Sequence, residues 1–269
     1  MRQRLTQILI IVAASTLFLA CGEQDVDKIG EAQECLDSAT AETAASCEDL
    51  VSGLESEKAY MVRCSVAFLK QGFDDPSKFE EIFSALSPSE DSSGSSNPML
   101  SAMAVLAFDT TENAADAQTK CDQSGSPGFI MLASMSNMAT TIAGSGTGDL
   151  LDTISSGGEV TPEQLEDALS NLDTSDDESL GQSANLIADS YCSDSATADS
   201  DVCDDINQAT SDDDTDAETG AKVSCLLEFD YTTELLADSL PPTVDASNEC
   251  RWRECRVTLE VPGATACSS

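Results

Sequence analysis

The 269-residue sequence contains no histidine. This absence excludes Ser-His-Asp and Cys-His nucleophilic sites, histidine-containing zinc sites and the commonest general base of enzymes. Aromatic residues are also scarce, at 4% of the chain with one Trp and three Tyr. Carboxylate-pair catalysis of the glycosidase type stays open, but such sites bind sugars on aromatic platforms, which this composition supplies poorly. We therefore expect a protein that is not an enzyme and holds no cofactor.

Basic residues are few as well. Only 12 Lys and Arg stand against 50 Asp and Glu, which gives a formal net charge of −38 at pH 7. Nucleic acid and anionic lipid head groups both bind proteins through Lys and Arg. The composition therefore excludes nucleic acid as a partner, and it predicts strong self-repulsion that salt or divalent ions relieve.

Long apolar runs are absent after residue 20. The run over residues 5–19, LTQILIIVAASTLFL, is shorter than the roughly 20 residues that a membrane-spanning helix needs. It follows a cationic head and ends at Ala20, which are the marks of a secretory signal peptide. Cys21 comes directly after Ala20. In that position it resembles the acylated cysteine of bacterial lipoproteins, although Phe18 and Leu19 stand where that signal usually has Leu and a small residue.

The lipoprotein resemblance implies that residues 1–20 are removed, that Cys21 carries the lipid, and that residues 21–26 form a short tether. Two or more acyl chains anchor a protein stably, whereas one is marginal. In enteric-type sorting an Asp after the cysteine retains lipoproteins at the inner membrane, and this chain has Gly22 there. The resemblance thus predicts an outer-membrane protein on the periplasmic or outer face. The alternative is an ordinary secretory peptide cut elsewhere, which leaves Cys21 as one more thiol.

Ten cysteines follow Cys21, and an even number in an exported protein indicates a disulfide framework. Residues 35–49 (CLDSATAETAASCED) and 192–205 (CSDSATADSDVCDD) share the pattern Cys-x-Asp-Ser-Ala-Thr-Ala-acid, followed by Cys-acid-Asp. The shared pattern indicates a duplication. In each copy the two cysteines flank the turn of a helical hairpin at nearly equal distances, where a bond is geometrically reasonable. The predicted disulfides are Cys35–Cys47 and Cys192–Cys203.

Abundant Ala, Leu, Met and Glu predict an all-α fold, an array of antiparallel helical hairpins cross-linked by disulfides. One such domain is expected over 27–240, with duplicated segments at 27–86 and 179–240. Helices are expected over 27–36, 43–54, 57–71, 98–108, 113–123, 127–143, 161–172, 179–191 and 222–240, with another that begins at Asp75.

Residues 241–269 break this pattern. The segment CRWRECRVTLEV over 250–261 holds the only Trp and finishes with strand-like alternation. We expect a small irregular or β C-terminal cap that is held by Cys250, Cys255 and Cys267.

The expected helix over 57–71 and the Gly72-Phe73-Asp74 that follows it are similar to the helices of helical-repeat lipoproteins. That class includes the tetratricopeptide-type accessory lipoprotein of TRAP transporters. No full 34-residue consensus is present, so the likeness extends to architecture alone. It implies a non-catalytic scaffold or interaction module with a protein partner in the cell envelope, because such helical arrays act as binding surfaces.

One acidic cluster suggests a metal. Its acids alternate like the ligands of an EF-hand loop, but the sixth position is Ala217 rather than Gly and the twelfth is Val223 rather than Glu. We favour a solvated acidic loop and assign no metal site, while weak binding of divalent cations stays open. A calcium-dependent surface binding protein and a carboxylate-based hydrolase are therefore the alternative functions. The candidate ligands are Asp212, Asp214, Asp216 and Glu218.

Overall fold

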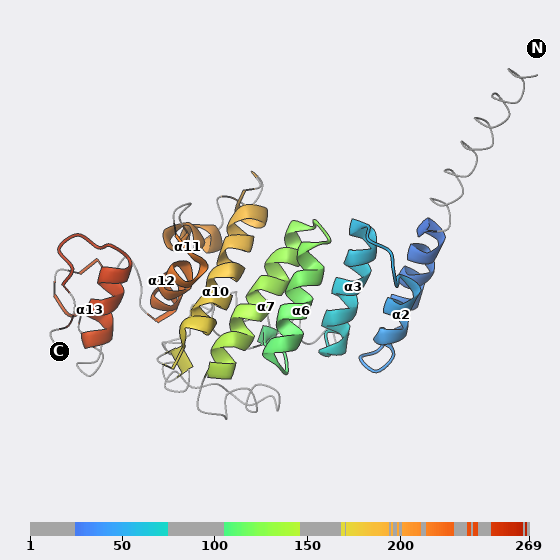
Figure 1. Ribbon diagram of the computed structural model, residues 1–269, viewed down its shortest axis with the longest axis horizontal. Helices are drawn as coiled ribbons and strands as arrows, with labels where there is room; N and C mark the ends of the chain where they lie inside the picture. The colour runs from blue at the N-terminus through green and yellow to red at the C-terminus, as the bar shows by residue number, and fades with distance from the viewer. Residues whose placement is uncertain are drawn as a thin grey trace, which may run out of the picture. The chain divides into compact units, whose positions relative to one another are not determined.

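The computed structural model describes residues 25–74, 105–145, 171–193, 201–210, 214–228 and 249–265, with a few more at 168–169, 195, 198, 236–237, 239–241 and 267. Every regular element in these ranges is a helix (Figure 1). The fold is all-α and cross-linked by disulfides, as the sequence predicts. Within the same ranges, no helix combines the length and the hydropathy of a membrane span.

The chain divides into two units, residues 1–75 and residues 76–269. Within the second unit the C-terminal helix packs on its neighbour. The expected division into a domain over 27–240 and a cap over 241–269 stays a prediction. The expected signal peptide over 1–20, most of the tether, and most of the helices expected from Asp75 and over 161–172 lie outside the described residues.

The described part of the first unit contains three helices: residues 25–36, α2 (Ala44–Leu50) and α3 (Glu57–Lys70). Their buried apolar residues recur at spacings of three and four, so that each helix presents one apolar face to the other two. Together they form one core. Its buried members are Ile29, Ala32, Ala44, Cys47, Val51, Ala59, Val62 and Val66.

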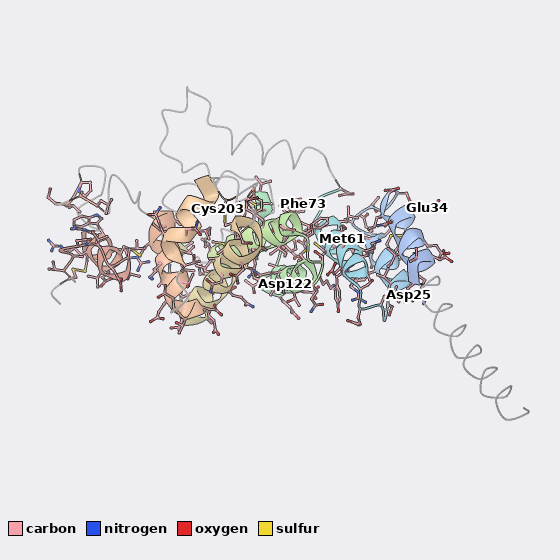
Figure 2. The ribbon with its side chains drawn as sticks, turned by 90° about the horizontal axis from the view of Figure 1, so that it is seen from above. Asp25, Glu34, Met61, Phe73, Asp122 and Cys203 are labelled. Atoms are coloured by element: carbon pink, nitrogen blue, oxygen red, sulfur yellow. A yellow bond between two sulfur atoms is a disulfide. The ribbon has the colours of Figure 1, made fainter. Side chains whose placement is uncertain are left out.

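Both ends of α3 follow local rules. The Ser56 side chain accepts a hydrogen bond from the Ala59 amide and caps the first turn. At the other end Gly72 takes a φ of +77°, and the amides of Gly72 and Phe73 donate to the carbonyls of Leu69 and Phe68. This is a Schellman ending, closed by an edge-to-face contact of the Phe68 and Phe73 rings at 5.3 Å; Phe73 is labelled in Figure 2. The sequence prediction of this helix and of its end at Gly72 is confirmed.

Among its described residues, the second unit is built on four longer helices that contact one another in chain order (Figure 1). These four are α6 (Thr111–Asp122), α7 (Pro127–Ser145), α10 (Thr174–Ile187) and α12 (Asp216–Glu228). Helices α6, α7 and α10 also share buried polar contacts. The shorter π-helix η1 (Ala188–Cys192) and helix α11 (Asp201–Ala209) follow α10, and α13 (Glu249–Thr258) follows α12.

Helix α7 lies at the centre of the second unit. Every residue from Ala133 to Ala143 is buried, and α7 contacts both α6 and α10. Met135 and Met138 belong to this core, where their flexible thioethers fill irregular gaps. An all-round buried helix is what its apolar composition predicts.

Helices α10 and α12 approach each other at two glycines. A Cβ at Gly181 would lie 1.7 Å from the backbone oxygen of Asp216, and a Cβ at Gly220 would lie 1.7 Å from that of Asp177. Each glycine thus meets the residue that stands four positions before the other glycine, so the two contacts are reciprocal. Any side chain would force the helices apart, since only glycine permits this backbone approach.

The C-terminal segment contains a helix over residues 249–258, so the prediction of an irregular or β cap is wrong for these residues. Trp252 and Cys255 of α13, and Leu259 just after it, lie at helical spacing and pack in one cluster with Cys225 of α12. Burying Trp252 against α12 stabilises the helix more than the short alternation after Cys255 could stabilise an isolated strand. Just after the helix, Glu260 takes a φ of +54°. Gly usually stands in that position, so the glycine that commonly marks a helix end is missing here.

We predict that Gly181→Ala or Gly220→Ala lowers the free energy of unfolding by about 1–3 kcal/mol, because the added Cβ overpacks a backbone contact. Gly128→Ala in the first turn of α7 is the matched control, since its Cβ would meet nothing within 4 Å. The control should be neutral or stabilising by up to about 1 kcal/mol. Urea unfolding followed by circular dichroism measures all three. Equal midpoints for Gly181→Ala and Gly128→Ala would contradict the close approach.

Candidate functional site

The lipidation site expected at Cys21 lies outside the described residues. The ten later cysteines are all disulfide-bonded, so in this part of the chain none is a thiol that could act as a nucleophile or metal ligand. Disulfides of this density form and persist in oxidising compartments. The cysteine framework therefore agrees with export of the chain.

Two disulfides lie in the two segments that share the cysteine pattern. Cys35–Cys47 joins the end of helix 25–36 to α2, and Cys192–Cys203 joins η1 to α11, each with a Cα–Cα distance of 5.5 Å. These are the two pairs that the duplicated spacing predicts. Cys47 and Cys203 are fully buried, so the bonds are part of the packed core. Cys203 is labelled in Figure 2.

Two more disulfides hold the C-terminal helix. Cys225–Cys255 joins α12 to α13, and Cys250–Cys267 ties α13 to the residues that follow it. The three cysteines that were expected to hold the cap are all used here. Their fourth partner, Cys225, lies in the second half of α12 and is buried.

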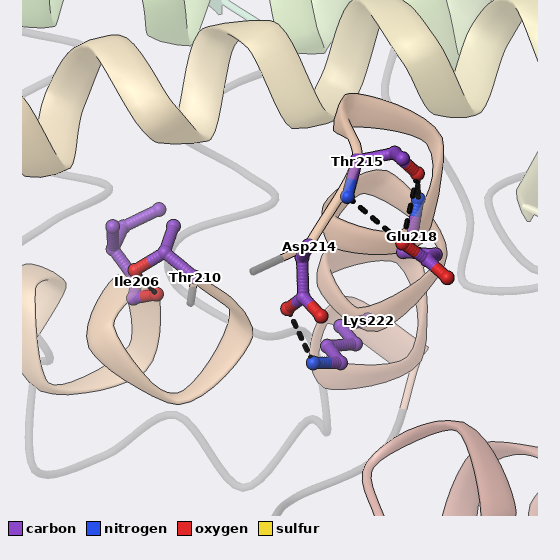
Figure 3. Close-up of polar contacts among 6 residues, drawn as sticks. All are labelled: Ile206, Thr210, Asp214, Thr215, Glu218 and Lys222. Atoms are coloured by element: carbon purple, nitrogen blue, oxygen red, sulfur yellow. Dashed lines mark hydrogen bonds and ion pairs between the residues drawn. The ribbon is translucent and has the colours of Figure 1, made fainter. Parts of the chain in front are cut away.

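The acidic cluster suggested as a metal site forms the start of α12 (Figure 3). The Glu218 carboxylate accepts hydrogen bonds from the Thr215 amide at 2.8 Å and the Thr215 hydroxyl at 2.9 Å. The Thr215 hydroxyl oxygen in turn accepts from the Glu218 amide at 3.3 Å. This reciprocal pair is a capping box, and it starts α12 six residues before the expected start at Lys222. The expected end at residue 240 is also wrong, because residues 236, 237, 239 and 240 are not helical.

Two other acids of this cluster are also engaged by protein groups. The Asp214 carboxylate pairs with the Lys222 ammonium at 2.5 Å, and both side chains are more than four-fifths buried. The Asp216 carboxylate accepts from the Asn185 amide at 2.8 Å, which joins α12 to α10 beside the glycine contact. Asp212 lies outside the described residues. Across the described ranges, no three ligand-type side chains converge as a metal site would require.

The acidic run 173–178 has a similar role at α10. The Asp173 carboxylate accepts from the amides of Ser175 and Asp176, and the Asp176 carboxylate accepts from the Asp173 amide. The helix expected to begin at Ser179 therefore begins at Thr174. Carboxylates in a first turn also complement the positive end of the helix dipole. Acids that the sequence presents as loop-like thus start both helices.

These contacts change the ionisation of the acids. The Thr215 amide and hydroxyl lower the pKa of Glu218 below its usual 4.5, and the Ser175 hydroxyl and Asp176 amide lower the pKa of Asp173. Asp177 differs, because burial raises the pKa of its carboxyl while the nearby Arg251 opposes that shift. The cap acids are held in the charged form, which suits hydrogen-bond acceptance rather than proton transfer.

A buried network of neutral side chains joins α6, α7 and α10. The Gln118 amide donates to the Ser183 hydroxyl at 2.8 Å and to the Ser134 hydroxyl at 3.2 Å. The Asn137 amide donates to the Gln118 oxygen at 3.0 Å, and to the hydroxyls of Ser179 and Ser183 at 3.1 Å each. Buried polar groups without partners are costly, so this network specifies one alignment of the three helices.

The network does not have the chemistry of an active site. Its amides and hydroxyls do not titrate near neutral pH, and their hydrogen bonds are directed at one another. The sequence analysis missed it, although Ser134, Asn137 and Thr141 of α7 share one helical face. Neutral polar residues at that spacing give no signal that distinguishes a buried network from a solvated face.

Comparisons with protein families, with curated proteins and with solved structures gave no match to this chain. The function therefore has to be argued from the residues and the contacts described above.

We predict that Glu218→Gln keeps the capping box but removes its pH dependence, because Gln can accept the same hydrogen bonds without titrating. A lowered folded-state pKa stabilises the protein above pH 4.5, and that contribution is lost as the pH falls through the folded pKa. The variant should therefore be less stable than the original at pH 7, and the gap should close well below pH 4.5.

Urea unfolding at pH 7 and well below pH 4.5 measures the difference in unfolding free energy between Glu218→Gln and the original protein. Glu31→Gln, on an exposed residue of helix 25–36, removes the same charge without touching a cap and should show no comparable gap. A Glu218→Gln gap that persists unchanged at the lower pH would contradict the role given to the ionised carboxylate.

Proposed function

We propose that the protein is a non-catalytic helical scaffold of the bacterial cell envelope, held at the outer membrane by acyl chains on Cys21. The observation that carries the proposal is the order of residues at the N-terminus: a cationic head, an apolar run over 5–19, then Ala20 and Cys21. A cysteine directly after a signal-peptide cut is where envelope lipoproteins are acylated. Residues 21–24 then tether the body, whose first helix begins at residue 25, to the lipid.

The cysteine framework supports export. All ten cysteines after Cys21 are disulfide-bonded, and such a set would not persist in a reducing cytoplasm. This leaves Cys21, alone among eleven cysteines, with a different environment in the chain: it directly follows the apolar run. Lipidation gives that odd cysteine a role.

Charge supports a lipid rather than an electrostatic anchor. The chain has 50 acids and only 12 basic residues, so anionic head groups repel its body. Two or more acyl chains supply the affinity that the surface lacks. The same charge selects the partner, a protein of the envelope that presents Lys and Arg to the acidic helices.

The use of the acids favours a scaffold over a calcium-dependent binder. Asp214, Asp216 and Glu218 each contact protein groups at the start of α12. A calcium ion at this cluster would have to replace the Lys222 ion pair and open the Thr215 capping box. The acids therefore stabilise a helix, which is what a rigid binding surface requires.

We predict that Cys21→Ser abolishes the anchor. The variant should accumulate as uncleaved precursor or as a soluble periplasmic form, because serine cannot be acylated through a thioether. Fractionation of the envelope and mass spectrometry of the N-terminal peptide measure the outcome. Full-length Cys21→Ser that still fractionates with the outer membrane in full amount would refute the proposal.

Two variants of the neighbouring residue are matched controls for this experiment. Gly22→Ala keeps the cysteine and should leave acylation and outer-membrane location unchanged. Gly22→Asp should be acylated equally but remain at the inner membrane where enteric-type sorting operates. Loss of acylation in Gly22→Ala would show that the effect of Cys21→Ser lies in the cleavage site and not in the thiol.

A further inference from the structure

Two disulfides of the second unit interlock along the chain. Cys225 is bonded to Cys255, and Cys250 is bonded to Cys267. In the sequence, Cys250 therefore lies between Cys225 and Cys255, and its partner Cys267 lies after both. The hairpin bonds differ, because no other cysteine lies between Cys35 and Cys47, or between Cys192 and Cys203. The C-terminal cysteines thus face a choice of partners that the hairpin cysteines do not.

The entropy of closing loops in the unfolded chain does not favour the native disulfide pairing. Four cysteines allow three pairings, and the native one closes segments of 30 and 17 residues. Pairing in chain order, Cys225–Cys250 and Cys255–Cys267, would close shorter segments of 25 and 12 residues. Loop-closure entropy then favours chain-order pairing over the native pairing by a factor of about two in their equilibrium populations. Synthesis from the N-terminus adds to this bias, since Cys250 follows Cys225 before Cys255 is available.

Noncovalent packing selects the native partner of Cys225. Cys255 is fully buried and Cys225 is 1% exposed, in the cluster that also holds Trp252 and Leu259. Cys250 is exposed on the same helix, five residues earlier. Five residues turn a helix by about 140°, so Cys250 and Cys255 lie on different faces. A Cys225–Cys250 bond would therefore turn Trp252 away from α12 and prevent the cluster.

We propose that the C-terminal cap is a substrate for a thiol–disulfide isomerase, which converts chain-order bonds into Cys225–Cys255 and Cys250–Cys267. A catalyst thiolate attacks a sulfur of the Cys225–Cys250 bond, forms a mixed disulfide and releases one cysteine thiolate. Exchange with the Cys255–Cys267 bond follows, and the last thiolate expels the catalyst. Two disulfides are broken and two are formed, so no net oxidation occurs.

The direction of the exchange follows from burial. Once Cys225–Cys255 forms, both cysteines are inside the Trp252 cluster, where an attacking thiolate has no access. The native Cys225–Cys255 bond is thus protected, while chain-order bonds on an unpacked cap stay open to attack. With Cys225 and Cys255 paired, Cys250 and Cys267 are left to bond with each other. The proposal depends on the connectivity of these bonds and not on the lipid at Cys21.

Oxidative refolding of the purified full-length mature protein tests the proposal. The protein is reduced and unfolded in guanidinium chloride, then refolded with diamide alone, or with diamide followed by reduced and oxidised glutathione and a purified bacterial disulfide isomerase. Peptide mapping without reduction identifies the bonds. We expect Cys35–Cys47 and Cys192–Cys203 in both conditions, but the native C-terminal pairs in less than half of the molecules with diamide alone, rising at least twofold with the isomerase.

A double variant identifies the cause. Cys250→Ser with Cys267→Ser removes the competing cysteines, so Cys225–Cys255 should form equally well with and without the isomerase. Cys35→Ser with Cys47→Ser is the matched control and should leave the isomerase dependence of the C-terminal pairs unchanged. Native C-terminal pairing in full yield with diamide alone, or an isomerase requirement that survives the first double variant, would overturn the proposal. Neither result bears on membrane anchoring, which the Cys21→Ser experiment tests separately.

Discussion

Covalent bonds between helices are the constraint on which the rest of this structure depends. The chain carries a formal net charge of −38 and has few large aromatic side chains for its core, so its helices repel one another while burying small residues. A disulfide that closes a loop of about a dozen residues stabilises a fold by roughly 3 kcal/mol. The bonds Cys35–Cys47 and Cys192–Cys203 close loops of this size. They hold helices together at the points where charge alone would separate them.

Within the second unit, alignment comes from contacts that tolerate little change. The Gly181 and Gly220 contacts fix how α10 and α12 approach, and the Gln118–Asn137 network fixes α6, α7 and α10. Neither device has groups suited to catalysis. Both specify one rigid arrangement, which is what a binding surface needs and what supports the scaffold function proposed here.

The sequence predicted the structure correctly where a residue type favours a single structural role. Gly72 after an apolar stripe marked the end of α3, and repeated cysteine spacing marked two hairpins. The prediction failed where a residue type has two roles. The acids at Asp173 and Glu218 were interpreted as loop residues but cap helices, and Glu260 ends α13 in a backbone conformation that glycine usually takes. For the candidate site, the sequence named the acids of the cluster but not their partners, since Lys222 and Asn185 approach them only in the folded chain.

The account is tested most directly by reducing the disulfides of the mature protein and recording its circular dichroism at 222 nm in low salt and in about 1 M salt, where the Debye length falls to about 3 Å. If the bonds hold the helices against charge repulsion, reduction in low salt removes most of the helical signal, and high salt restores part of it. A reduced protein that keeps its full helical signal and its urea midpoint in low salt would contradict the account.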